Sequence, residues 1–192
     1  MRQFESGAVR DNATGKGRCD LLPLSIIANH VLHDADNGGH EDTVILLREI
    51  DLLRICGGES CEVASIVSDI LHIAAKAMYH GDIIDMLLDV ALLYESGAQK
   101  YKERNWERGI PCTCFIDSGI RHLLKWSAGW MDEYHDRAFV WNMLGLLWTV
   151  TNKPEYNDIG HSCKNCAYFS EDIDSNPCAE CKWHSKWEAE RT

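Results

Sequence analysis

The chain has 192 residues and a formal net charge of −11, and 45% of its residues are hydrophobic. That hydrophobic share supports a core, which excludes a wholly disordered chain and favours one main domain with a small appendage. The acidic balance argues against a protein that coats DNA or RNA, because polyanion binding needs a basic face. A small nucleotide stays compatible, since Mg²⁺ and a few local basic groups can carry its charge.

The N-terminal residues 1–18 contain no apolar segment of a secretory signal, and no apolar run in the chain reaches the roughly 18 residues of a membrane span. We therefore expect a cytoplasmic protein without a membrane partner. Nine cysteines in such a chain indicate reduced thiols and metal binding rather than a disulfide framework.

The chain begins with a polar, glycine-containing arm that ends at an apolar anchor, and we assign residues 1–24 to it. From residue 25 to residue 152 the hydrophobic pattern is helical, with almost no strand alternation. This pattern predicts an all-α helical bundle. The expected helices cover residues 42–56, 61–80, 82–96, 99–105, 113–128 and 132–151.

The clearest helix is 61–80, where Ser60 can cap the start and Gly81 can close the end. Its apolar residues follow the spacing of one buried stripe, namely Val63, Ile66, Val67, Ile70, Leu71, Ala74 and Met78. Asp82 is the expected N-cap of the next helix. In the last helix one side carries Phe139, Asn142, Met143, Leu146 and Val150. Asn142 is the polar member of that side, and a buried amide needs a partner.

Residues 153–192 are expected to be a linker followed by a zinc module. Two CxxC pairs, separated by eleven residues, can supply a tetrahedral set of four sulfurs from Cys163, Cys166, Cys178 and Cys181. A structural Zn²⁺ is the favoured interpretation, since so short a segment cannot bury a core. A contact module for a protein or a nucleic acid is the alternative. The other five cysteines show no paired metal spacing, and most are expected to be small apolar fillers.

Between residues 97 and 142 the sequence concentrates carboxylates, basic groups and aromatic rings. Lys and Arg can neutralise phosphate oxygens, carboxylates near a helix start can hold Mg²⁺, and Trp and Tyr can stack on a base. These residue types suit a nucleoside phosphate. The sequence contains no Walker A motif, because Gly17 follows Gly15-Lys16 where Ser or Thr would stand.

Several segments resemble the phage-associated dATP/dGTP diphosphohydrolase N-terminal domain family. The arm carries FESGAVRD from residue 4, then GKGR from residue 15 and DLLP from residue 20. GAxKY from residue 97 and RNWxxGIP from residue 104 follow, and then DS, RH, DExH and WN between residues 117 and 142. The resemblance covers most of residues 4–150. Residues 25–82 look like an insertion into the helical nucleotide-binding domain, 25–152.

The resemblance implies a MazG-like all-α fold and a metal-dependent hydrolase of (deoxy)purine nucleoside triphosphates that releases a nucleoside monophosphate. It also implies Mg²⁺ or Mn²⁺ as cofactor and, for a phage protein, the host cytoplasm as location. Asp132, Glu133 and His135 are then the expected catalytic residues. The expected magnesium ligands are Asp117, Asp132 and Glu133. The expected nucleotide-binding residues are Lys16, Arg18, Lys100, Tyr101, Arg104, Asn105, Trp106, Arg121, His122 and Asn142.

Two alternatives stay open. Trp130 and Met131 intervene where the family often carries an acid, and Asn142 stands where a metal-binding Asp would be expected. These departures favour a non-catalytic phage protein that binds or sequesters a nucleotide. The second alternative is an interaction scaffold built on the zinc module. The expected partner is a small nucleotide rather than a nucleic-acid polymer, and a homo-oligomer through the insertion or another apolar face is also compatible with the sequence.

Overall fold

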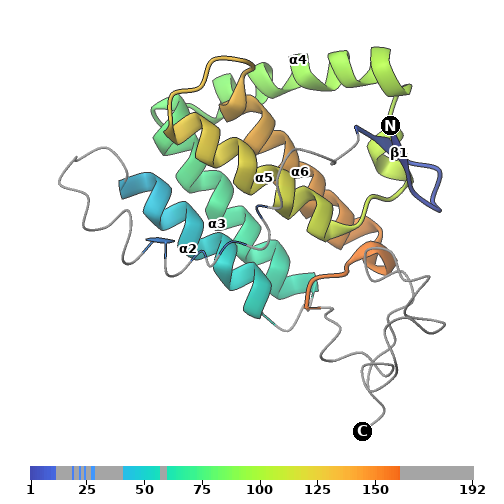
Figure 1. Ribbon diagram of the computed structural model, residues 1–192, viewed down its shortest axis with the longest axis horizontal. Helices are drawn as coiled ribbons and strands as arrows, with labels where there is room; N and C mark the ends of the chain where they lie inside the picture. The colour runs from blue at the N-terminus through green and yellow to red at the C-terminus, as the bar shows by residue number, and fades with distance from the viewer. Residues whose placement is uncertain are drawn as a thin grey trace, which may run out of the picture.

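The computed structural model describes residues 1–11, Cys19, Leu22, Leu24, Ile27, Ala28, 41–56 and 60–160 (Figure 1). Some sequence predictions lie outside these residues: the phosphate-binding roles of Lys16 and Arg18, and the whole cysteine-rich zinc module. They stay predictions.

The described part is almost entirely helical, which confirms the all-α class. Its α-helices are α2 (Glu41–Ile55), α3 (Ser60–Tyr79), α4 (Ile83–Tyr101), α5 (Cys112–Ser127) and α6 (His135–Asn152). Two 3₁₀ helices, η3 (Asn105–Arg108) and η4 (Pro154–Tyr156), flank the last pair. The N-terminal arm forms a small antiparallel hairpin of β1 (Arg2–Gln3) and β2 (Val9–Arg10).

Helices α2, α3, α5 and α6 form the bundle, and α4 crosses one end of it (Figure 1). Helix α6 is central, because it packs against α3, α4 and α5. The hairpin of the arm lies beside the C-terminal end of α4 and η3 (Figure 1). The arm thus places N-terminal residues next to the start of segment 97–142, whose residue types suit a nucleoside phosphate.

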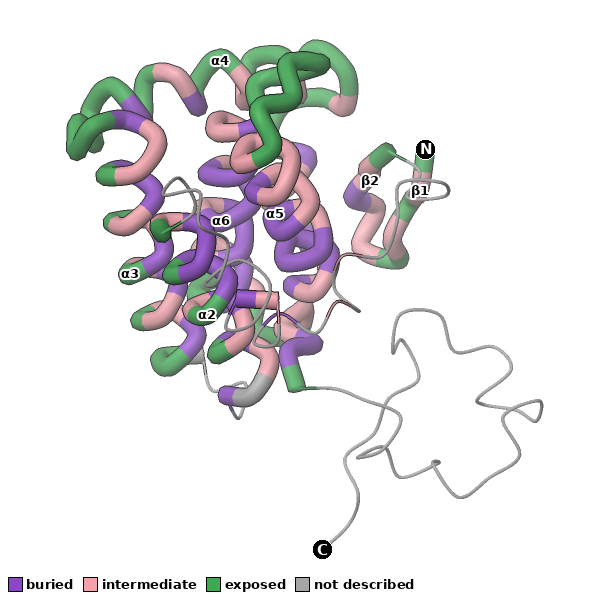
Figure 2. Tube along the Cα trace, turned by 60° about the vertical axis from the view of Figure 1, so that its left-hand side comes forward, coloured by how far each residue is buried: buried purple, intermediate pink, exposed green. Residues whose placement is uncertain are grey.

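The core confirms the predicted helix faces. Val63, Val67, Ile70 and Ala74 of α3 are fully buried, and the other members of the predicted stripe are partly buried. The predicted side of α6 is buried in full, including the amide of Asn142. Buried segments of the helices face one another inside the bundle (Figure 2). Of the five described cysteines, Cys56, Cys112 and Cys114 are buried, as expected of apolar fillers.

Most helix boundaries agree with the sequence to within a few residues, and Asp82 caps α4 as predicted, since its Oδ1 accepts a hydrogen bond of 2.9 Å from the Asp85 amide. The separate helix expected at 99–105 is wrong. Helix α4 continues to Tyr101, and then Lys102 and Arg104 adopt positive φ angles of 82° and 54° that a helix does not allow.

The start of the last helix is also wrong. Helix α6 begins at His135 rather than at residue 132, so Asp132 and Glu133 lie in the preceding loop. The Asp132 carboxylate is held by Lys125 and by the His135 ring, at 2.9 and 2.8 Å, instead of capping backbone amides at a helix start. Side-chain contacts across the loop therefore decide where the helix begins.

Helices α5 and α6 approach closely at two glycines. A Cβ built on Gly145 would lie 2.5 Å from Cε1 of Phe115, and one built on Gly119 would lie 2.6 Å from Cε of Met143. Phe115 and Met143 are themselves fully buried, so neither can move away easily. The missing side chains allow the two helices that carry most of the candidate site to pack directly together.

Helix α4 buries Met86 and Val90 but exposes several large aliphatic side chains, and its outer surface is exposed along much of its length (Figure 2). The exposed residues are Ile83, Ile84, Leu87, Leu88 and Leu92. Within the described ranges, no helix combines the length and apolarity needed to cross a membrane.

Candidate functional site

A cavity of about 1390 Å³ lies among α4, η3, α5, α6, the loop before α6 and the N-terminal hairpin. It brings together segments that are far apart in the sequence. Its lining includes the following residues singled out from the sequence: Lys100, Tyr101, Arg104, Asn105, Trp106, Asp117, Arg121, His122, Asp132, Glu133 and Asn142. His135 is buried beside the cavity and contacts two of the residues that line it, His122 and Asp132.

Arg10 anchors the arm in this cavity. Its Nη1 donates a hydrogen bond of 3.0 Å to the Cys114 carbonyl, and its Nη2 donates one of 2.8 Å to Oδ1 of Asn142. The guanidinium also lies over the rings of Phe115 and Trp141, 5.1 and 5.6 Å from their centroids. Burial lowers the pKa of Arg10 to about 10, so the group is still a cation at neutral pH.

From the sequence, Arg10 was assigned to the arm but not to the site. The available signal was Asn142, a lone amide on an apolar helix face that needed a partner. Which residue would supply that partner could not be found from helical spacing, because Arg10 reaches Asn142 from 132 positions away.

Asn105 holds the arm from the opposite side. Its Oδ1 accepts a hydrogen bond of 3.0 Å from the Val9 amide, and its Nδ2 donates one of 2.9 Å to the Val9 carbonyl. The side chain thus pairs with the β2 backbone as a neighbouring strand would. Asn105, which was expected to bind the nucleotide, holds the arm in place as one wall of the cavity.

Four aromatic side chains form one wall of the cavity, and we call them the aromatic wall: Tyr94, Trp106, Trp141 and Trp148. Trp106 lies 5.5 Å from Tyr94 and 4.9 Å from Trp148 between ring centroids, and Tyr94 lies 6.0 Å from Trp141. Only Trp106 was assigned to the nucleoside from the sequence. The spacing of Trp141 and Trp148, two turns apart on α6, was a signal for a shared face.

Four basic side chains of the cavity are each engaged by a carboxylate, namely Lys100, Arg104, Arg121 and Lys125. Arg121 pairs with Asp117 one turn away on α5, and Arg104 pairs with Glu107. Lys100 reaches back to the arm, where both Asp11 oxygens accept from its ammonium at 2.8 Å. These hydrogen bonds from Lys100 to Asp11 raise the pKa of Lys100, so its positive charge is secure.

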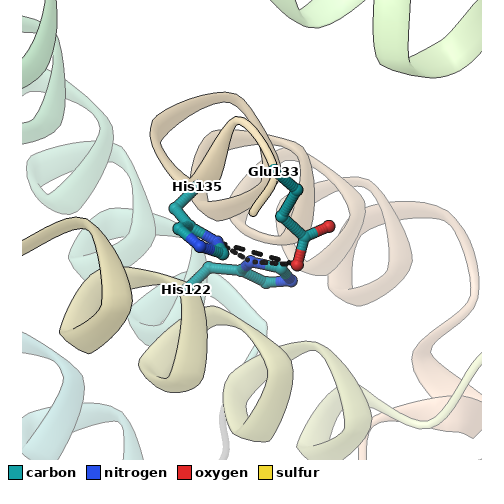
Figure 3. Close-up of side chains that lie close together, drawn as sticks. All are labelled: His122, Glu133 and His135. Atoms are coloured by element: carbon teal, nitrogen blue, oxygen red, sulfur yellow. Dashed lines mark hydrogen bonds and ion pairs between the residues drawn. The ribbon is translucent and has the colours of Figure 1, made fainter. Parts of the chain in front are cut away.

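A cluster of two histidines and one carboxylate lies where α5 faces the start of α6 (Figure 3). His122 comes from α5, Glu133 from the loop and His135 from the first residue of α6. The two Nδ1 atoms are 3.1 Å apart, and Oε1 of Glu133 lies 3.6 Å from Nδ1 of His122 and 3.7 Å from Nδ1 of His135. Figure 3 shows all three side chains pointing toward one another.

The environment of this cluster fixes the charges of His122 and of the neighbouring Asp132. Burial, with the nearby His135 and cationic side chains, lowers the pKa of His122 to about 3, so its ring is neutral at physiological pH. The hydrogen bonds from Lys125 and His135 lower the pKa of Asp132 to about 2. A neutral imidazole beside ionised carboxylates is the state in which such groups accept a proton or bind a cation.

The cluster differs from the expected magnesium set in its membership. Asp117 is occupied with Arg121 on α5, and both oxygens of Asp132 are occupied by Lys125 and His135. Glu133 is shared by the two sets. His122, expected to bind nucleotide, lines the cavity and is also a member of the cluster. Its signal in the sequence was present but ambiguous, because the separation of 13 residues between His122 and His135 has meaning only once α5 and α6 pack together.

Comparison with known proteins supports the resemblance seen in the sequence. Residues 74–159 match the model of the family described as dATP/dGTP diphosphohydrolase, N-terminal. Neither the curated proteins nor the solved structures contained a match to the chain. The matched residues run from the last turns of α3 through η4 and include the aromatic wall, the cluster of histidines and Asn142. Residues 74–159 of this chain are therefore similar to the dATP/dGTP diphosphohydrolase N-terminal family.

Proposed function

We propose that the chain is a nucleotide hydrolase that converts a (deoxy)purine nucleoside triphosphate to the monophosphate and pyrophosphate. The observation that carries this proposal is the meeting of three kinds of group in one cavity: cations, an aromatic wall and acid-base side chains. Each kind matches one part of a nucleotide or of its hydrolysis. The purine preference comes from the similarity to the dATP/dGTP diphosphohydrolase family.

The cations would bind the phosphates, with Arg121 and Lys125 on α5 and Lys100 on α4 facing the same space. Arg121 offers a planar pair of donors that suits two phosphate oxygens. Phosphate oxygens would then compete with Asp117 and Asp11 for these donors. Lys16 and Arg18, which follow the arm hairpin in the sequence, are proposed as further phosphate ligands.

The aromatic wall would bind the nucleoside. Trp106 and Trp141 present ring surfaces to the cavity, and base–aromatic stacking contributes about 1–3 kcal/mol per base. Tyr94 packs between these two tryptophans and holds their orientation. The wall tolerates any base, so selectivity would come from polar groups at its edge, such as Tyr101.

In the proposed reaction a water oxygen attacks the α-phosphorus and the bond to the bridging α–β oxygen breaks. Pyrophosphate leaves with the bonding electrons, and the proton of the water passes to an acceptor. Glu133 is the proposed acceptor, because its carboxylate is exposed to the cavity and lies beside two imidazoles. Arg121 would neutralise the charge that grows on the phosphate oxygens.

The family resemblance implies Mg²⁺ or Mn²⁺, and the cavity fits such an ion only in part. Mg²⁺ prefers six oxygen ligands, often keeps several waters and is commonly held by one or two carboxylates plus substrate phosphates. Of the three expected magnesium ligands, Glu133 is the one not engaged by Lys or Arg, since Lys125 binds Asp132 and Arg121 binds Asp117. An ion carried in by the triphosphate and held by Glu133 would polarise the phosphate and the water.

The test is product analysis. Purified protein is incubated with each deoxynucleoside and ribonucleoside triphosphate and with Mg²⁺ or Mn²⁺, and products are separated by ion-exchange chromatography. We expect monophosphate and pyrophosphate in equal amounts from a purine substrate. Glu133→Gln should lower the rate by at least about 100-fold, whereas Glu62→Gln, an exposed glutamate on α3, should not. Absence of both products from every nucleotide rejects the proposal.

A second candidate function is nucleotide sequestration without turnover. The observation behind it is Trp130, which lines the cavity where the family often carries an acid and which stacks on the Lys125 ammonium at 5.0 Å. An aromatic ring there adds binding surface but no acid. Calorimetry that shows tight nucleotide binding without metal, together with an unchanged nucleotide after incubation, would favour this function.

A further inference from the structure

We propose that His122, Glu133 and His135 form a binding site for a divalent transition-metal ion of the zinc class, with one coordination position open to the cavity. This site uses none of the cysteines of the tail, and it shares Glu133 with the magnesium ion proposed above but adds two histidines. The ion would bind whether or not a nucleotide is present, so the inference goes beyond the proposed function.

The Nδ1 atoms of His122 and His135 and Oε1 of Glu133 form a triangle of nearly the size that a zinc-class ion needs. Zinc binds histidine nitrogen at about 2.0–2.1 Å and carboxylate oxygen at about 2.0–2.2 Å, so neighbouring ligands of a tetrahedral ion lie about 3.3–3.4 Å apart. The three atoms of the cluster are separated by 3.1, 3.6 and 3.7 Å. The two longer separations both involve Glu133, whose side chain is 52% exposed and free to close by the remaining few tenths of an ångström.

Asp132 orients the ring of His135. Its Nε2 lies 2.8 Å from Oδ1 of Asp132, and Lys125 binds the other Asp132 oxygen at 2.9 Å. The carboxylate of Asp132 can accept the Nε2 proton, so Nδ1 is the nitrogen that faces the cluster and would bind the ion. A histidine that binds a metal through one nitrogen almost always donates its other N–H to such a partner. Asp132 is therefore a positioning residue for the site.

The chemistry of the three ligands favours an ion of the zinc class. Two imidazole nitrogens with one carboxylate suit Zn²⁺ and its neighbours in the transition series, whereas Mg²⁺ and Ca²⁺ prefer oxygen alone. The burial of His122 and His135 keeps competing water from two of the ligands. Three protein ligands leave a fourth position. His122 and Glu133 line the cavity, so a water or a phosphate oxygen in it can reach that position.

The experiment measures metal binding by the full-length chain without nucleotide. A background variant that combines Cys163→Ser, Cys166→Ser, Cys178→Ser and Cys181→Ser removes the four zinc ligands expected in the tail. The metal-free protein is titrated with Co²⁺, followed by visible absorption, and with Zn²⁺, followed by calorimetry. We expect one equivalent of each ion, and a tetrahedral Co²⁺ spectrum without the near-ultraviolet band that thiolate ligands produce.

Substitutions then assign the site. In this background His122→Asn and His135→Asn should abolish the Co²⁺ spectrum, and Glu133→Gln should weaken Zn²⁺ binding by at least about 10-fold. Asp132→Asn should weaken it by about 10- to 100-fold, as loss of a supporting carboxylate does. His72→Asn, an exposed histidine on α3, is the matched control and should bind as the background does. Far-ultraviolet circular dichroism confirms that each variant is folded.

Two results would overturn the inference: no Co²⁺ spectrum in the background variant, or unchanged binding in the folded Glu133→Gln and His122→Asn variants. Glu133→Gln keeps the test decisive even where a substitution of the buried His135 unfolds the protein. Because no nucleotide is present, a chain that hydrolyses nothing but binds Co²⁺ through this cluster upholds the site. A chain that hydrolyses nucleotides and binds no Co²⁺ here rejects the site alone.

Discussion

The Nη2 of Arg10 donates a 2.8 Å hydrogen bond to Oδ1 of Asn142 and so connects the N-terminal hairpin to the buried face of α6. Asn142 is 2% exposed, and its Nδ2 donates to the Ala138 carbonyl at 2.7 Å, so the amide is satisfied at both ends. This bond makes the short arm, which has few apolar residues of its own, a part of the folded structure and one wall of the cavity.

Asn142→Leu should lower the free energy of unfolding by about 1–3 kcal/mol, because it leaves a buried guanidinium with one acceptor fewer. Urea denaturation measures this change. Asn152→Leu is the matched control: Asn152 lies on the same helix and also donates to the carbonyl four residues back, at 2.9 Å, but it is exposed. Its effect should stay within about 0.5 kcal/mol. Equal effects of the two substitutions would show that the arm bond contributes nothing.

Lys100 and Asp11 provide a test of phosphate binding in which two substitutions should have opposite effects. Lys100→Met removes a donor from the cavity and should weaken triphosphate binding by about 3- to 10-fold. Asp11→Asn removes the carboxylate that competes with phosphate for this ammonium, so binding should stay equal or tighten. Calorimetry with a slowly hydrolysed triphosphate analogue measures both.

Lys76→Met, on the exposed side of α3, serves as the control for the change of net charge. A loss of affinity of the same size in Lys100→Met and Asp11→Asn would contradict phosphate binding by Lys100. It would mean instead that the ion pair acts by holding the arm against α4.

Asp89 joins three helices and should make the fold sensitive to acid. It accepts hydrogen bonds from Arg137 of α6 and, at 3.0 Å, from the Tyr79 hydroxyl of α3. The Arg137 hydrogen bond is the largest cause that lowers the pKa of Asp89 below its ordinary 3.8. The stabilisation is thus fully present above pH 3.8 and is lost as the pH falls below that value toward the lower pKa of the folded state.

Asp89→Asn should lower stability by about 1–2 kcal/mol at neutral pH and flatten the fall in melting temperature below pH 4. Thermal denaturation between pH 2.5 and pH 7, a window of roughly the range in which a carboxylate titrates, measures both effects. Asp69→Asn, an exposed aspartate on α3, should leave the profile unchanged. A parallel loss of stability at every pH would reject the assigned role of the Asp89 carboxylate.

Replacing glycine by alanine at two helical positions should change the free energy of unfolding in opposite directions. Gly145→Ala places a Cβ against the fully buried Phe115 ring and should cost about 1–3 kcal/mol of unfolding free energy. Gly97→Ala on α4 meets no atom within 4 Å and should stabilise the protein by up to about 1 kcal/mol. Urea denaturation compares them, and equal effects would contradict the close approach of α5 and α6.

Local features of the chain could be predicted from the sequence because their causes are local. The apolar stripe of α3 repeats with the helical period, and Asp82 caps α4 through an amide three residues away. The similarity to the family could also be predicted, since its motifs are short stretches such as 104–111. Predictions at the helix ends were weaker: α6 begins at His135 because contacts of Asp132 with Lys125 and His135 act across a loop.

The sequence by itself determined the helices, the core-facing sides and the kinds of group available for chemistry. Only the tertiary structure decided which of those groups meet. His122 and His135 come together because Gly119 and Gly145 let α5 and α6 pack closely, and Arg10 reaches Asn142 because the arm folds back over the bundle. Helical periodicity fixes directions around one axis, whereas the distance between two axes depends on side-chain packing from every neighbouring element.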